Sequence, residues 1–245
     1  IEDMQILSSN LVSNGDFSQI GSEQITNGDF ATDSAWVKGT GWNISNGSLN
    51  ASSTTNQSYQ LNTGIVTNKT YKVTYTISNY VSGSVRIELG GFNVSVGAER
   101  SANGTYTEYI VALGNDAILF DGIISFTGSI DNVSVKEVGQ DWTLGTGWSI
   151  GEDIANCSGG AAQVLYQANL IPIGTQYKLT FTVSNFSQGY LSAYGGDWDA
   201  QGVIEANGTF TIYTEKLATS NTGFVGNGFV GSITNISLIE ITDDT

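Results

Sequence analysis

The sequence has no histidine and only one cysteine, and each shortage excludes a class of chemistry. Without histidine there is no imidazole to ligate zinc or to act as the base of a serine-type triad. The single cysteine, Cys157, cannot form a disulfide within the chain, and no histidine is present to activate its thiol. The usual zinc sites, triads and thiolate catalysis are therefore excluded.

Basic residues are also few, because eight lysines and arginines face 23 acidic residues and the formal net charge is −15. A protein of this charge repels a phosphate backbone and an anionic membrane surface. No apolar run approaches the roughly 18 residues that a membrane-spanning helix needs. We expect neither a nucleic acid partner nor membrane insertion.

Proline occurs once and helix-forming residues are scarce, whereas glycine, threonine, valine, isoleucine and aromatic residues are plentiful. This composition favours strands joined by Gly, Asn and Ser turns. In TYKVTYTISNY, residues 70–80, apolar residues alternate with Lys, Thr and Ser, which is the period of a strand with one buried face. Further strands are predicted at 84–89, 105–113, 117–120, 123–126 and 131–138.

The chain contains an internal duplication. Trp36 and Trp42 match Trp142 and Trp148 at the same offset, which also carries residues 70–80 onto QYKLTFTVSNF at 176–186. Near the repeat ends, IDNVSVKEV at 130–138 matches ITNISLIEI at 233–241. We predict an all-β protein of two tandem β-sandwich jelly-roll domains, repeat 1 at 24–138 and repeat 2 at 139–245.

The first 23 residues have no assigned domain. SNGDF at 13–17 repeats TNGDF at 26–30, and the second copy leads directly into repeat 1. Repeat 2 has no such lead-in and starts abruptly at Gly139. Residues 1–23 are interpreted as a linker or as the remnant of a preceding unit. Because residue 1 is Ile, we expect a piece of a longer or processed protein.

The stretch GTGWNI at 39–44 recurs as GTGWSI at 145–150. Its glycines permit a sharp bend and close backbone approach. A feature retained in both repeats fits a shared scaffold better than a choice of ligand. Recognition is expected where the repeats differ.

The order of NGDF, Trp, GTGW, a YKVTYT strand and a closing IDNVSVKEV strand resembles the galactose-binding-like jelly rolls that include carbohydrate-binding modules. It is most similar to the repeats of bacteriophage virion proteins such as tail fibres, receptor-binding proteins and capsid-decorating fibres. The resemblance implies that the opening and closing strands lie side by side.

Some members of this family hold a structural calcium ion at these strands. The resemblance places its acidic ligands at Asp29 and Asp131 in repeat 1, whereas repeat 2 has Thr234 at the position of Asp131. Calcium requires several hard oxygen ligands. The alternative interpretation is that both carboxylates serve local turns. No other cofactor is expected.

Carbohydrate binding needs an aromatic platform flanked by polar groups. The best stretch is GYLSAYGGDWDAQG, 189–202, in which the alternation places Tyr190 and Tyr194 on one side, followed by Asp197, Trp198 and Gln201. The corresponding stretch of repeat 1 offers Arg86 and Glu88 on the solvent-exposed face of its strand and Phe92 in the loop. The alternative is that these aromatics pack against a neighbouring subunit or the other repeat.

Acidic residues are numerous, but no spacing singles out a catalytic pair, so we expect no enzyme. The first hypothesis is a virion-surface structural or adhesion protein, of the phage fibre or capsid-decoration type. Its partners would be other virion proteins, copies of itself and host surface polysaccharide. The alternative is a tandem pair of carbohydrate-binding modules from a secreted polysaccharide-degrading enzyme. Both place the chain on a virion surface or outside the cell.

Overall fold

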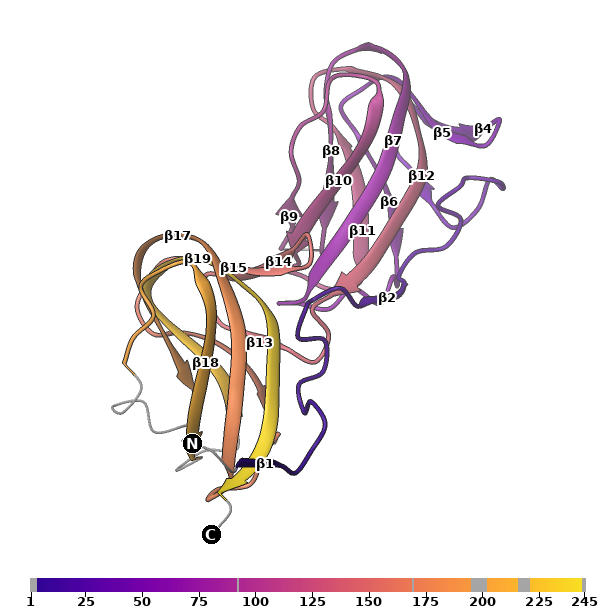
Figure 1. Ribbon diagram of the computed structural model, residues 1–245. Coiled ribbons are helices and arrows are strands. Elements are labelled where there is room, and N and C mark those ends of the chain that lie inside the picture. Colours follow the sequence, from indigo (N-terminus) through magenta and orange to yellow (C-terminus); the bar gives the residue numbers. More distant parts are fainter. Residues whose placement is uncertain (1–3, 92, 169, 195–201, 216–220, 244–245) are drawn as a thin grey trace. The chain divides into compact units, whose positions relative to one another are not determined.

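The computed structural model describes residues 4–91, 93–168, 170–194, 202–215 and 221–243. Regular structure in these residues consists of strands, which confirms the all-β prediction (Figure 1). The described part of the chain holds no helix of the length and apolarity needed to span a membrane.

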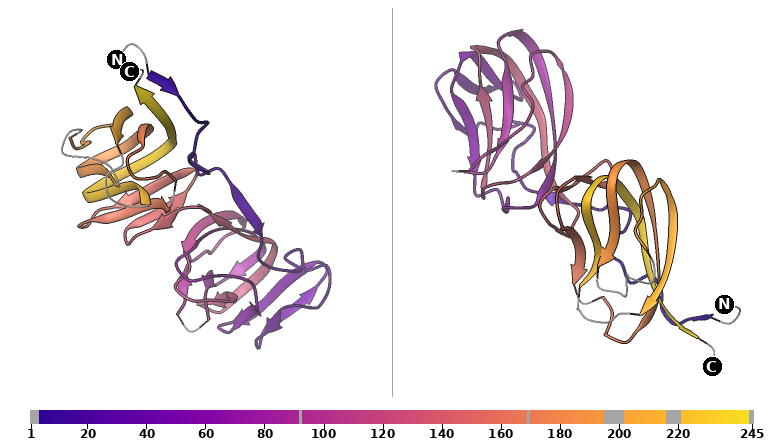
Figure 2. Two further views of the ribbon diagram at one scale, coloured as in Figure 1. Left: turned by 90° about the horizontal axis from the view of Figure 1, so that it is seen from below. Right: turned by 90° about the vertical axis from the view of Figure 1, so that its left-hand side faces the viewer.

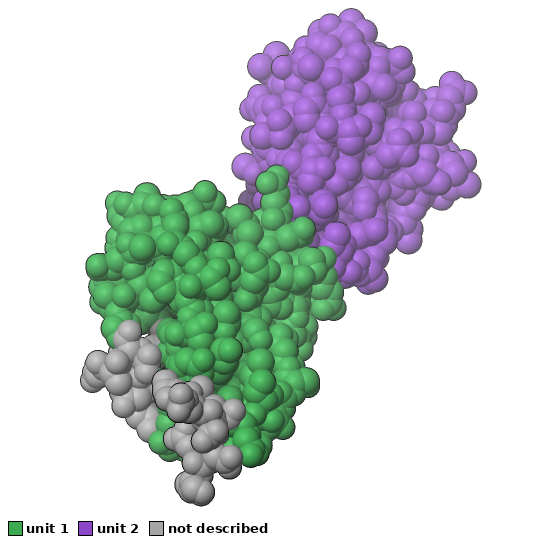
Figure 3. Space-filling model, viewed as in Figure 1, with its two compact units in different colours: residues 1–19, 139–245 green, residues 20–138 purple. Residues whose placement is uncertain are grey.

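The chain forms two compact units, which are coloured separately in Figure 3. Unit 2 is Ile20–Val138 and contains repeat 1, whereas unit 1 combines Ile1–Gln19 with Gly139–Thr245 and contains repeat 2. The segment interpreted as a linker or remnant at 1–23 is therefore divided between the units. Unit 2 is inserted into the sequence of unit 1.

Unit 2 is a sandwich of two antiparallel sheets. The first sheet has the order β10-β7-β12-β5-β4, with β2 added beside β12, and the second has the order β3-β6-β11-β8-β9. The strands of the first sheet are β2 (Ile20–Glu23), β4 (Trp42–Ser45), β5 (Ser48–Thr54), β7 (Thr70–Ser82), β10 (Gly104–Val111) and β12 (Phe126–Val138). Those of the second are β3 (Val37–Lys38), β6 (Gln57–Leu61), β8 (Val85–Leu89), β9 (Ser95–Val96) and β11 (Ala117–Gly122).

The core of unit 2 lies between these sheets. In β7, Tyr71, Val73, Tyr75 and Ile77 are buried, while the intervening Lys and Thr side chains lie on the other face. This confirms the period-two prediction. Phe120 from the second sheet packs edge-on against Tyr75, with ring centroids 5.3 Å apart.

Unit 1 has the same plan with longer strands. Its strands are β1 (Met4–Ile6), β13 (Thr143–Leu144), β14 (Trp148–Gly151), β15 (Ile154–Ser158), β16 (Gln163–Ala168), β17 (Gln176–Tyr194), β18 (Gly208–Glu215) and β19 (Asn221–Asp243). The first part of β17 pairs with β18 and with the end of β19, and its last part pairs with the beginning of β19. Strands β17 and β19 thus each span what are two strands in unit 2.

The N-terminal segment completes unit 1. Strand β1 pairs with the end of β19, from Met4 opposite Asp243 to Ile6 opposite Ile241, and Figure 2 shows these strands side by side. Leu11 then donates its backbone N–H to the carbonyl of Leu238 at 2.8 Å. Phe17 is buried against Trp142, with ring centroids 5.3 Å apart. The lead-in that repeat 2 lacks is therefore supplied by the start of the chain.

We call residues 7–17 the lead-in of unit 1 and residues 20–30 the lead-in of unit 2. Each lead-in is fixed by a buried glutamine whose amide bonds both backbone groups of one residue. Gln60 bonds the N–H and carbonyl of Thr26, both at 2.9 Å. Gln167 bonds those of Ser13, at 3.2 and 2.6 Å.

The two GTGW tryptophans are core residues, as predicted for a fold signature. Trp42 donates its indole N–H to the carbonyl of Asn56 at 2.8 Å, and Trp148 donates to that of Gln163 at 3.0 Å. Their rings lie 6.0 Å from Phe126 and 6.2 Å from Phe229, respectively. Both are buried.

One predicted strand is wrong. Residues 123–125 lie between β11 and β12, and Phe126 is the first residue of β12. This connection packs against Gly83, where a β-carbon would lie 1.9 Å from the carbonyl oxygen of Ile124. The apolar run Ile123-Ile124 therefore belongs to a tightly packed corner.

Replacing Trp42 or Trp148 by alanine is expected to lower the free energy of unfolding by about 3–5 kcal/mol, because each leaves a large cavity and removes a hydrogen bond. Urea denaturation followed by circular dichroism measures this loss. Unchanged stability of both variants would contradict the assignment of these residues to the scaffold.

Two equivalent tyrosines differ in their hydroxyl partners. Tyr71 accepts a bond from the backbone N–H of Val66 at 2.8 Å, whereas the buried hydroxyl of Tyr177 has no partner among the described residues. We expect Tyr71→Phe to cost about 1 kcal/mol of stability at pH 7, and Tyr177→Phe to be neutral or stabilising. Thermal unfolding of both variants measures the difference.

The buried hydroxyl of Tyr177 also predicts a pH dependence of stability. Burial raises the pKa of Tyr177 to about 12, above the value of about 10 in an unfolded chain. Folding stability is therefore unaffected by this group below about pH 10 and falls between about pH 10 and 12, where only the unfolded chain ionises. Tyr177→Phe should lose less stability than the parent between pH 9 and 11 in urea titrations. Equal losses would contradict this assignment.

Candidate functional site

Only part of the predicted carbohydrate-binding set falls in the described chain. Tyr190 lies in β17 opposite Asn227 and Gly228 and is 36% exposed, while the adjacent Leu191 is fully buried, as the alternation predicts. Tyr194 ends β17, where its backbone pairs with Gly223. Asp197, Trp198 and Gln201 lie outside the described residues, as does Phe92 of repeat 1. The aromatic platform of repeat 2 stays a prediction.

The two predicted calcium ligands make local hydrogen bonds. Asp29 accepts from the backbone N–H of Ala31 at 3.3 Å, and Asp131 accepts from that of Asn132 at 2.6 Å. These are the turn contacts of the alternative interpretation. Within the described ranges, no three acidic, histidine or cysteine side chains gather closely enough to hold a metal ion. Calcium also takes carbonyl oxygens as ligands, so the calcium site at Asp29 and Asp131 stays a prediction.

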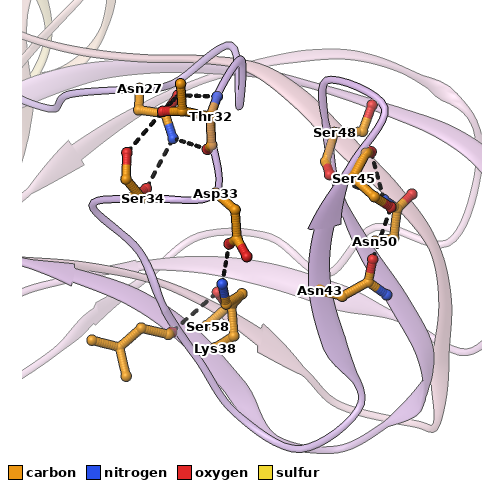
Figure 4. Close-up of polar contacts among 11 residues, drawn as sticks. Asn27, Thr32, Asp33, Ser34, Lys38, Asn43, Ser45, Ser48, Asn50 and Ser58 are labelled. Atoms are coloured by element: carbon orange, nitrogen blue, oxygen red, sulfur yellow. Dashed lines mark hydrogen bonds and ion pairs between the residues drawn. The ribbon is translucent and has the colours of Figure 1, made fainter.

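Loop contacts beside Asp29 are shown in Figure 4. The Asn27 amide donates to the carbonyls of Thr32 and Ser34 at 2.7 and 2.9 Å, and Lys38 forms an ion pair with Asp33. In the β4–β5 hairpin, Asn50 donates to the carbonyl of Ser45 at 3.1 Å. These polar side chains therefore form contacts within their own turns.

The second sheet of unit 2 presents a mixed outer face. One row of cross-strand neighbours crosses all five strands in the order Val37, Tyr59, Leu119, Glu88 and Val96. Val37 and Val96 on the edge strands are about half exposed, Tyr59 is partly exposed, and Leu119 and Glu88 are buried. Residues paired across an antiparallel sheet share a face. The row therefore combines aliphatic edges, an aromatic ring and a carboxylate.

An arginine joins two carboxylates beside this row. The Arg86 Nε donates to Oε1 of Glu88 at 2.7 Å, and Nη2 of Arg86 lies 3.3 Å from Oδ2 of Asp121. Alternation alone predicted Arg86 and Glu88 on the solvent face, but the Glu88 side chain is only 2% exposed. Its contact with Arg86 compensates this burial. The guanidinium is held from two strands, β8 and β11, and retains 30% exposure.

The same face leads into a hollow of about 410 Å³. Leu61 and Ala117, the next outward-facing pair after Tyr59 and Leu119, line it together with Leu113, Asn62 and Asp116. Leu61 and Leu113 are both more than half exposed. Exposed aliphatics bordered by amide and carboxylate groups are typical of a binding surface.

Unit 1 carries different residues at the equivalent face. Thr143, Tyr166, Gly223 and Tyr194 form the corresponding row. Gly223 replaces Leu119, and a β-carbon there would lie 2.0 Å from the carbonyl oxygen of Leu165. The outer faces thus differ between the units, whereas the lead-in and GTGW contacts are shared.

A second charged cluster of unit 2 lies at the inner side of β10. Glu108 accepts from the Tyr75 hydroxyl at 2.9 Å and from the Ala98 backbone at 2.7 Å, and lies 3.3 Å from Arg100. The Arg100 guanidinium lies 4.6 Å from the Tyr106 ring centre. Burial, with Glu108 alongside, raises the pKa of Tyr75 above its usual value.

This cluster is apolar in unit 1. The matching registers place Phe181 at the position of Tyr75, Ile212 at that of Glu108 and Ile204 at that of Arg100. The Phe181 and Phe210 rings keep the 5.7 Å spacing of Tyr75 and Tyr106. The fold therefore accepts either set, and the charged cluster of unit 2 is interpreted as part of its core.

The triple variant Tyr75→Phe, Arg100→Ile, Glu108→Ile is expected to unfold at a free energy close to that of the parent, because unit 1 already packs this combination. Arg100→Ile alone should cost about 2 kcal/mol, since Glu108 is then left without its cation, although Arg100 is partly exposed. Denaturant titrations compare them. A triple variant no more stable than the single one would contradict this core interpretation.

No family model matches the chain, and neither does any curated protein. Among solved structures, the tandem CBM22-1-CBM22-2 domains of Paenibacillus barcinonensis Xyn10C are 9% identical, with a TM-score of 0.38, covering 96% of this chain and 100% of that chain. A truncated AlyQ with CBM32 and alginate lyase domains is 10% identical, with a TM-score of 0.28 and coverages of 98% and 89%. Allantoicase from Saccharomyces cerevisiae is 10% identical, with a TM-score of 0.24 and coverages of 98% and 100%.

Proposed function

We propose that the chain is a non-catalytic recognition module whose unit 2 binds a neutral glycan on the outer face of its second sheet. The observation that carries the proposal is the Arg86 guanidinium, which Glu88 and Asp121 hold on the same sheet face as Tyr59. An aromatic ring covers the apolar face of a sugar, and oriented polar groups bind its hydroxyls. Because two carboxylates already hold the Arg86 side chain, little of its conformational entropy is lost on binding.

Charge favours a neutral ligand. The chain carries a net charge of −15, and at this site one guanidinium faces two carboxylates. An anionic polysaccharide would be repelled both at a distance and at the site. Neutral sugar hydroxyls meet no such barrier.

The arrangement of carboxylates supports a binding role over hydrolysis. Glycosidases place two carboxyl groups on opposite sides of the scissile bond. Here Glu88 and Asp121 contact the same guanidinium, and Glu88 is buried. This pair therefore serves to hold Arg86.

The wider context that we propose is a virion surface or another extracellular structure, with the chain as a phage fibre or capsid-decoration protein. Its acidic surface favours solubility and discourages adsorption to nucleic acid. Copies of the chain and other virion proteins would then be its partners, and host polysaccharide its ligand. In the alternative context, a secreted polysaccharide-degrading enzyme, the same face would act in a monomer.

A glycan array followed by calorimetry tests the binding site. We expect affinity for a neutral glycan at micromolar Kd, weakened at least about tenfold in Tyr59→Ala and in Arg86→Met. Tyr109→Ala is the matched control, because Tyr109 lies on the first sheet of the same unit, paired with Lys72, and should leave affinity unchanged. Binding that survives Tyr59→Ala and disappears in Trp198→Ala would move the site to repeat 2. An array without any bound glycan would overturn the proposal.

The oligomeric state separates the two contexts. Light scattering of the purified chain should give a defined oligomer if it is a virion component, and a monomer if it belongs to a secreted enzyme. Glycan binding is measured on the same sample, so that the two questions receive independent answers.

A further inference from the structure

The lead-in of unit 1 occupies a groove formed by residues 139–245. Val12 and Phe17 are buried in it, and the Trp142 indole N–H donates to the carbonyl of Asn14 at 3.0 Å. Gly15 accepts from the backbone N–H of Ile236 at 2.9 Å. Backbone hydrogen bonds with pockets for alternate side chains are the mode by which an added strand binds a sheet edge.

Gly15 makes this groove selective. A β-carbon at Gly15 would lie 2.1 Å from the carbonyl oxygen of Ile236, and the equivalent β-carbon at Gly28 would lie 2.1 Å from that of Val133. The clashing atom is a backbone carbonyl oxygen of a strand, which cannot move aside as the end of a flexible side chain can. The groove therefore accepts glycine at this position and rejects larger residues.

The occupant is covalently joined to unit 2 and not to the groove. The segment that ends at Gln19 continues directly into unit 2 at Ile20. The residues that form the groove begin only after unit 2, at Gly139. The second NGDF segment, 26–30, is already bound within unit 2, where Phe30 packs against Trp36 at 5.3 Å. A segment that fits the groove equally well is the lead-in of a second copy of the chain.

We propose that unit 1 is an acceptor for β1 and the lead-in of another copy, and that copies associate by exchanging these residues, 4–17. The exchanged form keeps every contact of the groove, because donor and acceptor residues are the same. A copy's own lead-in has the higher effective concentration in dilute solution, so exchange is favoured where copies are crowded. The proposal is independent of glycan binding.

Two full-length variants test the exchange. Gly15→Val has an intact groove but a lead-in that cannot fit, whereas Gln167→Leu has an intact lead-in but a groove without the two bonds to Ser13. Mixed at high concentration, they should form a 1:1 heterodimer by light scattering, while each alone stays monomeric. Gly28→Val mixed with Gln167→Leu is the control and should give much less heterodimer, since its defect lies in unit 2 and its own intact lead-in competes for the groove.

A second measurement covers the case in which Gly15→Val does not fold. A protease site is inserted between Gln19 and Ile20 of the otherwise unchanged chain, which is cut and mixed with a fluorescent peptide of residues 4–19. We expect the peptide to exchange into the groove, and its Gly15→Val version to bind at least tenfold more weakly. Absence of the heterodimer from folded variants, or equal binding of both peptides, would overturn the proposal.

Discussion

The structure depends on one backbone contact that occurs once in each unit, the hydrogen bond between the glycine of an NGDF segment and the closing strand. Gly28 accepts from Val133 at 2.8 Å, and Gly15 accepts from Ile236 at 2.9 Å. The approach is so close that only glycine fits. This bond places Phe30 or Phe17 against the first tryptophan of its repeat. The opening segment is thereby fixed against the body of each sandwich.

The opening segment is held by this backbone hydrogen bond and by one buried glutamine. Neither interaction requires the opening segment to adjoin its sandwich in sequence. Unit 2 uses the adjoining segment, whereas unit 1 uses one separated from it by the whole of unit 2. Ile20 pairs with Val138, so the two ends of unit 2 are neighbours. An insertion whose ends meet closes the intervening loop without an additional entropic cost to unit 1.

The sequence predicted what depends on local pattern. Alternation in 70–80 and 176–186 gave the central strands, and the matched tryptophans revealed the duplication. The sequence interpretation did not assign the first NGDF segment to unit 1, because the contact between Phe17 and Trp142 joins residues far apart in the chain. A signal was present, since residues 7–13 and 20–26, which precede the two NGDF segments, are similar or identical at four of seven positions. Alternation also gave the direction of Glu88 but not its burial, which depends on neighbouring strands and on the contact with Arg86.

The two units show which positions are free to change. Tyr75, Glu108 and Arg100 in one core correspond to Phe181, Ile212 and Ile204 in the other, a concerted exchange of a paired charge cluster for apolar packing. Such an exchange costs little when all partners change together, and much when one changes alone. The outer face of the second sheet also differs between the units. The position of Leu119 in unit 2 is thus Gly223 in unit 1, and surface chemistry has diverged on a scaffold held by the same glycine, glutamine and tryptophan contacts.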